Sequence, residues 1–116
     1  MPPTPTTHTP VVWQAEAQDV ARAETLREAL REIIDPEIGL NIVELGLIRD
    51  VEFQPDKTWV KMILTTPFCP YGPAMIEQTR KKVTDASSQP ATVEMGMELW
   101  DPSMMEEGAG ADWGLF

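Results

Sequence analysis

The only cysteine of the chain, Cys69, has the side chain best suited to chemistry. It lies in the run TTPFCPYGP at residues 65–73, where three prolines restrict the backbone. The pattern predicts that a strand ends before this run and that a helix begins just after the cysteine. The N–H groups and dipole at the start of a helix stabilise a thiolate, which attacks electrophiles and binds metals. Cys69 is therefore our candidate functional thiol, although a lone cysteine is also a common packing residue.

Two further groups of polar residues are candidates for shaping a site around this thiol. Asp35 and Glu37 flank a proline directly after a predicted helix, which places two carboxylates around a rigid residue. Thr65 and Thr66 precede the cysteine, and their hydroxyl and amide groups could orient a ligand or cap the next turn. Each pattern also has an ordinary structural explanation, because Asp-Pro-Glu is common in turns and Thr-Thr-Pro at strand ends. Carboxylates beside a thiolate would favour a transition metal.

The chain lacks residues that several kinds of catalytic and metal site need, and this limits the chemistry that Cys69 can perform. His8 is the single histidine and lies in the N-terminal segment, so neither a Cys–His pair nor a Ser-His-Asp set is supported. Zinc and iron–sulfur clusters normally take four protein ligands, and one chain offers one thiolate. We therefore expect Cys69 to be a metal ligand only for a cluster or ion that is shared between chains or held briefly. We expect a protein that is not an enzyme.

Composition excludes several classes of partner. The 116 residues carry a net charge of −10, which repels the phosphates of nucleic acids and of anionic membranes. No apolar run approaches the length that spans a bilayer, and no basic residue precedes an apolar stretch near the N-terminus. We expect a cytoplasmic protein, and the acidic surface would suit a basic protein partner.

Hydrophobic spacing predicts the elements that position the candidate residues. Apolar residues three and four apart predict a helix from residue 19 to about 34, where Pro36 ends it. Alternation predicts a hairpin of strands 47–53 and 59–64, with a turn between them. A second helix over 73–85 and a strand over 92–100 follow. The methionines at 75, 95 and 97 are interpreted as core residues.

The element order α-β-β-α-β predicts an α+β fold of two layers, with two helices on one face of a small mixed three-stranded sheet. A right-handed crossover through the second helix makes the last two strands parallel. We expect residues 18–107 to form one domain, preceded by a flexible tail, rich in proline and threonine, at 1–17. Residues 108–116 form a second tail with an apolar end.

Two motifs together resemble a known family. The run DPEIGLNIVELGLI at residues 35–48, followed by TTPFCP at 65–70, strongly resembles the SufT-like and PaaD-like iron–sulfur assembly family. This is the MIP-eighteen family, formerly catalogued as a domain of unknown function. The resemblance covers the chain from about Leu26 to Met105. Relatives that act in phenylacetate breakdown carry further cysteines near the C-terminus, and their absence makes this chain similar to the SufT-like branch.

The resemblance implies an accessory factor that assembles iron–sulfur clusters or delivers them to client proteins. It implies that Cys69 is the reactive residue and that the acidic motif of Asp35 and Glu37 lies near it. The expected cofactor is a transient cluster or metal ion that one chain does not bind tightly. The expected partners are an assembly scaffold or carrier, client iron–sulfur proteins and a second copy of the chain. The alternative is a non-catalytic protein-binding adaptor in which Cys69 is structural and the apolar C-terminus recruits a partner.

Overall fold

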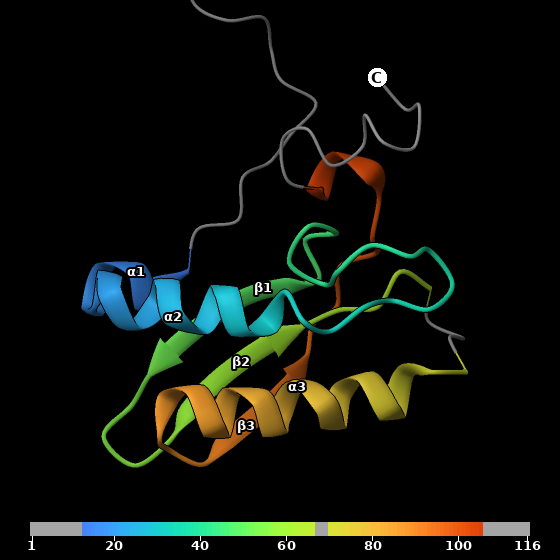
Figure 1. The fold of residues 1–116 in the computed structure, drawn as a ribbon. Coiled ribbons are helices and arrows are strands. Elements are labelled where there is room, and N and C mark those ends of the chain that lie inside the picture. Colours follow the sequence, from blue (N-terminus) through green and yellow to red (C-terminus); the bar gives the residue numbers. More distant parts are fainter. Residues whose placement is uncertain (1–12, 67–69, 106–116) are drawn as a thin grey trace, which may run out of the picture.

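The computed structural model describes residues 13–66 and 70–105, and Figure 1 shows how their helices and strands are arranged. In chain order the elements are α1 (Gln14–Gln18), α2 (Val20–Leu30), β1 (Ile48–Phe53), β2 (Thr58–Met62), α3 (Gly72–Ser87), β3 (Ala91–Met95) and the short 3₁₀ helix η1 (Pro102–Met104). The strands form one sheet in the order β1-β2-β3, antiparallel between β1 and β2 and parallel between β2 and β3. The predicted hairpin and crossover are both confirmed.

The helices and the sheet form two layers with the core between them. Helices α2 and α3 contact each other, α3 contacts β2 and β3, and α1 packs against β1 and α2 (Figure 1). The side chains that fill the space between the layers are fully buried and include Leu26, Leu30, Val51, Val60, Met62, Met75 and Val83. The predicted α+β class is confirmed, with α1 as an additional helix. No helix in the described ranges has the length and apolar character needed to cross a membrane.

Helix α2 begins where the sequence predicts and ends earlier. The carboxylate of Asp19 accepts a hydrogen bond from the backbone N–H of Arg22 at 3.1 Å, which caps the first turn. The helix stops at Leu30 rather than at residue 34. The reason is a small antiparallel pairing, because the backbone N–H of Ile42 donates to the carbonyl of Ile33 at 3.0 Å and Ile34 bridges to residue 41. Residues 33–35 are therefore not helical, and their pairing with residues 41 and 42 fixes the acidic turn between them.

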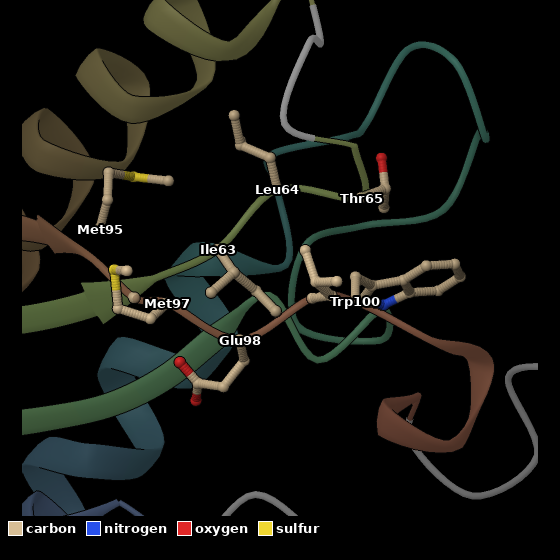
Figure 2. Close-up of a pocket in the computed structure, with 9 residues that line it drawn as sticks. Ile63, Leu64, Thr65, Met95, Met97, Glu98 and Trp100 are labelled. Carbon is tan, nitrogen blue, oxygen red and sulfur yellow. The ribbon is translucent and has the colours of Figure 1, made fainter.

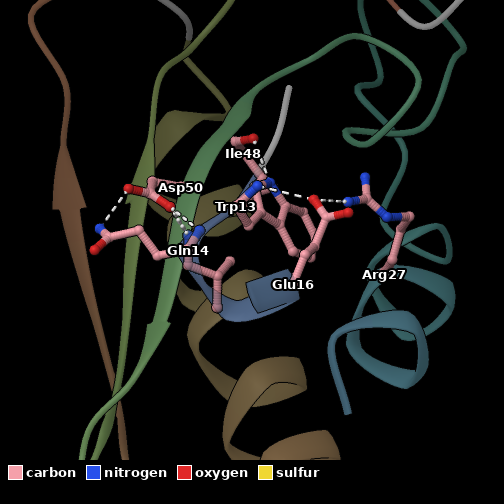
Figure 3. Close-up of polar contacts among 7 residues, drawn as sticks. Trp13, Gln14, Glu16, Arg27, Ile48 and Asp50 are labelled. Carbon is pink, nitrogen blue, oxygen red and sulfur yellow. Dashed lines mark hydrogen bonds and ion pairs between the residues drawn. The ribbon is translucent and has the colours of Figure 1, made fainter. Parts of the chain in front are cut away.

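The N-terminal tail ends earlier than we predicted, because residues 13–17 are packed on the domain. Trp13 is only 1% exposed, and its indole Nε1–H donates to the carbonyl of Ile48 at 3.1 Å (Figure 3). The Arg27 guanidinium lies 4.0 Å from the centre of the indole ring. Glu16 accepts hydrogen bonds from the Trp13 backbone at 2.8 Å and from Arg27 at 2.9 Å. The rest of the predicted tail, residues 1–12, lies outside the described residues, as does the predicted C-terminal boundary at 107.

Helix α1 also covers the outer edge of β1. The side-chain amide of Gln18 donates to the carbonyl of Phe53 at 3.0 Å and accepts from the Phe53 N–H at 2.8 Å. Gln14 donates to the carboxylate of Asp50 through its backbone N–H at 2.9 Å and its side chain at 2.7 Å (Figure 3). The side-chain amide of Gln18 therefore replaces a neighbouring strand, which protects this edge from pairing with another chain.

The last strand is shorter than predicted. Strand β3 ends at Met95 rather than at Trp100, although the Gly96 N–H still donates to the carbonyl of Met62 at 2.8 Å. The indole N–H of Trp100 then donates to the carbonyl of Leu45 at 2.7 Å and holds the chain against the loop before β1. Met75 is buried as expected, but Met95 and Met97 are 41% and 93% exposed. Our interpretation of these two methionines as core residues is wrong.

Candidate functional site

The acidic turn after α2 and the threonine pair after β2 lie side by side. The Thr65 hydroxyl donates to the Oδ2 atom of Asp35 at 3.1 Å, across 30 positions of the sequence. Asp35 is fully buried, while Thr65 is half-buried, so the contact lies at the boundary between the core and the surface. The structure therefore brings together two of the residues that the sequence singled out.

Asp35 organises the turn that carries Glu37. Its Oδ1 atom accepts the Glu37 backbone N–H at 2.9 Å, and its carbonyl accepts the N–H groups of Ile38 at 3.2 Å and Gly39 at 2.7 Å. The backbone φ angle of Gly39 is +87°, a left-handed conformation that glycine adopts at little cost. The side chain of Glu37 is exposed. Asp35 thus joins the turn to the end of β2, while Glu37 lies at the surface of the same turn.

The threonine pair leads directly toward Cys69, which lies outside the described residues together with 67 and 68. Thr65 and Thr66 are half-buried. On the far side of the gap, Tyr71 is the N-cap of α3 and makes no capping hydrogen bond through its side chain. Pro73 occupies the first turn, where the missing N–H is tolerated. The prediction that a helix begins just after the cysteine is confirmed, since α3 starts at Gly72.

The described residues do not make a metal site by themselves. Across residues 13–66 and 70–105, no three carboxylate, imidazole or thiol side chains are grouped closely enough to hold an ion. Both oxygens of Asp35 already accept hydrogen bonds, from Glu37 and Thr65. A cluster would therefore need ligands beyond this part of the chain.

An open cavity, which the sequence did not lead us to predict, lies next to the threonine pair. It has a volume of about 420 Å³ and is shown in Figure 2. Its lining residues come from the end of β2 and from the chain after β3, namely Ile63, Leu64, Thr65, Met95, Gly96, Met97, Glu98, Leu99 and Trp100. Thr65 therefore forms a wall of the cavity and also holds Asp35. The alternating apolar run at 95–99 was the available signal, and it was interpreted as core.

The contact between Thr65 and Asp35 predicts a measurable loss of stability in Thr65→Val. Valine has nearly the same shape but removes the hydroxyl donor from a buried carboxylate. We expect the free energy of unfolding to fall by about 1–3 kcal/mol, the cost of leaving such a group without a partner. Urea denaturation followed by circular dichroism measures it. Thr92→Val on β3 is the matched control, because Thr92 is exposed, and equal effects at the two positions would contradict the assignment.

Comparisons with known proteins agree with the two motifs. Residues 23–95 match the protein family described as "Iron-sulfur cluster assembly protein". A Fe-S protein maturation auxiliary factor of Porphyromonas gingivalis is 35% identical over 95 residues, which cover 79% of this chain and 90% of that protein. The Fe-S protein maturation auxiliary factor YitW of Bacillus subtilis is 38% identical over 66 residues, covering 56% of this chain and 65% of YitW. The match therefore spans just under two thirds of YitW.

A solved structure shares the fold. A domain of unknown function from Bacillus anthracis superposes with a TM-score of 0.75 at 24% identity, covering 86% of this chain and 98% of that domain. This likeness supports the two-layer architecture. Because the family match covers most of the chain and includes the acidic turn and the residues around position 69, the protein belongs to the family of iron–sulfur cluster assembly proteins.

Proposed function

We propose that this protein is a non-enzymatic accessory factor that helps to assemble iron–sulfur clusters or to deliver them to client proteins. The observation that carries the proposal is the hydrogen bond between Asp35 and Thr65, which joins the two motifs of the family at one place. The relatives named as Fe-S protein maturation auxiliary factors support the same role. An auxiliary factor of this kind would act in the cytoplasm, with a scaffold or carrier and client iron–sulfur proteins as partners.

Cys69 is proposed to supply the thiolate of this site. It follows Thr65 by four residues and precedes the first residue of α3 by three. The start of α3 has no capping hydrogen bond from its N-cap side chain, so its first N–H groups favour negative charge nearby. A negatively charged thiolate would be stabilised there. Asp35 and Thr65 would hold the surrounding backbone, with Thr66 and Glu37 completing the wall of the site.

The cluster is cargo in this proposal rather than a resident cofactor. One thiolate fills one of about four ligand positions of a cluster, so the others come from a second copy of the chain, a carrier or the client. Such incomplete ligation suits transfer, because a cluster held by few ligands is released readily. A homodimer in which two Cys69 thiolates share the cluster is the simplest form of this arrangement.

The experiment that tests the proposal is the substitution Cys69→Ser. We expect the variant to fold as the wild type does, because serine keeps the shape of the cysteine side chain and introduces no larger atom. We also expect it to lose support of client enzymes, since a hydroxyl stays protonated and binds iron poorly. The measurement is the activity of an iron–sulfur enzyme in cells that lack their own factor of this family and express the variant or the wild type.

Two further results make this test decisive. Circular dichroism and thermal unfolding must match between Cys69→Ser and the wild type, so that a loss of client activity is not a loss of fold. The conservative variant Thr92→Val, on an exposed position, must restore the client enzyme fully. Client activity that is restored equally by Cys69→Ser would remove the thiol from the mechanism.

The protein-binding adaptor is the second candidate, and the exposed side chains of Met97 and Leu99 favour it. In an adaptor Cys69 would be a packing residue. Alkylation of the native protein by iodoacetamide separates the two functions. Rapid modification supports the accessory factor, whereas protection that ends only on unfolding in urea supports the adaptor.

A further inference from the structure

Three apolar side chains stand exposed in one short run at the end of the sheet. Met95, Met97 and Leu99 are 41%, 93% and 76% exposed, and we call residues 95–99 the exposed strip. The other large apolar side chains of comparable exposure in the described residues are scattered, at Val20, Ile34 and Tyr71. Single exposed apolar residues are normal on a protein surface, but a contiguous group is typical of an interaction site.

The exposed strip borders the cavity described above, so the apolar surface is concave. Figure 2 shows Met95 and Met97 on one side and Trp100 on the other, with Ile63 and Leu64 between them. A volume of about 420 Å³ is sufficient for one or two apolar side chains. An apolar partner could therefore insert side chains here, in addition to lying on the surface.

The exposed strip continues an edge strand, because β3 ends at Met95, the first residue of the strip. Strand β3 is an edge of the sheet, and no other described strand pairs with its outer side. Within the described residues, the backbone groups of Met97 and Leu99 make no hydrogen bond. The opposite edge differs, because Gln18 occupies the backbone groups of Phe53 on β1. An uncovered edge accepts an extended segment through main-chain hydrogen bonds.

Around the exposed strip, three carboxylates outnumber two cations, Lys61 and Arg49. Glu94 and Asp101 are exposed, while Glu98 lies 3.4 Å from the Lys61 ammonium and 3.6 Å from the Arg49 guanidinium. The pKa of Glu98 is lowered, first by a hydrogen bond from its own backbone N–H and then by these two cations. The nearby cations are thus already paired, and the whole chain carries a net charge of −10. A partner that approaches this edge should be positively charged.

We propose that the exposed strip and its cavity bind an extended segment of a partner protein in which apolar residues alternate with lysine or arginine. The apolar side chains enter the cavity beside Met97 and Leu99, and a basic side chain faces the exposed carboxylate of Glu94, since Glu98 is already paired with Lys61 and Arg49. Apolar residues occupy positions 93, 95, 97 and 99, with glutamate at 94 and 98 and glycine at 96, and side chains opposite each other on neighbouring strands interact in pairs. This inference goes beyond the proposed function and does not depend on Cys69.

A synthetic peptide tests the proposal directly. The probe is a fluorescein-labelled ten-residue peptide with the repeating sequence Lys-Val-Lys-Leu, and binding to the full chain is followed by fluorescence anisotropy. We expect saturable binding that weakens with added salt. The double variant Met97→Ser/Leu99→Ser should weaken binding at least about tenfold, since buried apolar anchors dominate such interfaces. Peptides with Glu in place of Lys, or Ser in place of Val and Leu, should not bind.

The controls separate this site from general attraction to an acidic protein. Val20→Ser changes an equally exposed apolar residue on α2 and should leave the affinity within about twofold of the wild type. Cys69→Ser should also bind the peptide normally, whatever its effect on client enzymes. Binding that the double variant leaves intact would overturn the proposal. So would a wild-type dimer, detected by light scattering, that the double variant abolishes, since a second copy of the chain would then occupy the strip.

Discussion

Replacing Trp13 with alanine is expected to lower the free energy of unfolding by about 3–5 kcal/mol, the usual cost of truncating a buried aromatic side chain. The residue is 1% exposed, although it lies in a segment whose composition indicates a tail. Its removal takes away the ring over which the Arg27 guanidinium lies at 4.0 Å, and the indole donor to the carbonyl of Ile48. Urea denaturation followed by circular dichroism measures the change.

Two companion variants divide this effect into its parts. Trp13→Phe keeps an aromatic ring and removes the indole N–H, so it should cost less than alanine and still deprive the Ile48 carbonyl of the indole donor. Arg27→Ala, combined with Trp13→Ala in a double-mutant cycle, measures the coupling between guanidinium and ring, expected at about 0.5–2 kcal/mol. If Trp13→Ala changed stability by less than about 0.5 kcal/mol, the segment would behave as the flexible tail that its composition indicates.

The elements that the sequence predicted correctly are those whose signals are local. The hairpin follows from alternation on both sides of a turn with Pro55 at its second position. The Gln54 N–H donates to the Lys57 carbonyl at 2.8 Å and joins the two strands next to this turn. Helix α3 follows from the apolar spacing of Met75, Thr79 and Val83 and from the proline in its first turn. In each case neighbouring residues supply both the pattern and the contacts.

The predictions that proved wrong concern segments whose structure depends on contacts between distant parts of the chain. Trp13 is buried because the carbonyl of Ile48, on another element, accepts its N–H. The alternation at 92–100 shows which residues share a face but does not show whether a second layer covers that face. The bond from Trp100 to Leu45 directs the chain away from the sheet and leaves Met97 exposed. Periodicity contains no information about such a partner.

The candidate site was predictable only in part from the sequence. The motifs predicted that Asp35 and Thr65 belong to one site, and a hydrogen bond joins their side chains. No local signal shows that Asp35 bonds both to its own turn and to Thr65 at the end of β2. Both contacts form only because helix α2 ends before residues 33–35. The role of Cys69 stays a prediction, since that residue lies outside the described part of the chain.

The second large effect is expected at Gly46, in the loop that leads into β1. Its φ angle is +75°, and a Cβ atom added there would lie 2.0 Å from the carbonyl oxygen of Met104, at the end of η1. Alanine would therefore meet both an unfavourable backbone conformation and a backbone atom that cannot move alone. We expect Gly46→Ala to reduce the free energy of unfolding by about 4 kcal/mol, the sum of the two penalties. Urea denaturation measures it.

Gly39→Ala separates the two penalties of Gly46→Ala. Gly39 has a φ angle of +87°, but a Cβ atom added there would meet nothing within 4 Å, so only the backbone cost of about 1–2 kcal/mol applies. The difference between the variants measures the close contact between η1 and the loop. Because that contact adjoins the bond from Trp100 to Leu45, Gly46→Ala should also weaken binding of the alternating lysine peptide, while Gly39→Ala should not. Equal losses of stability in both variants would show that η1 moves away freely, and that the wall of the cavity formed by Trp100 is held by other contacts.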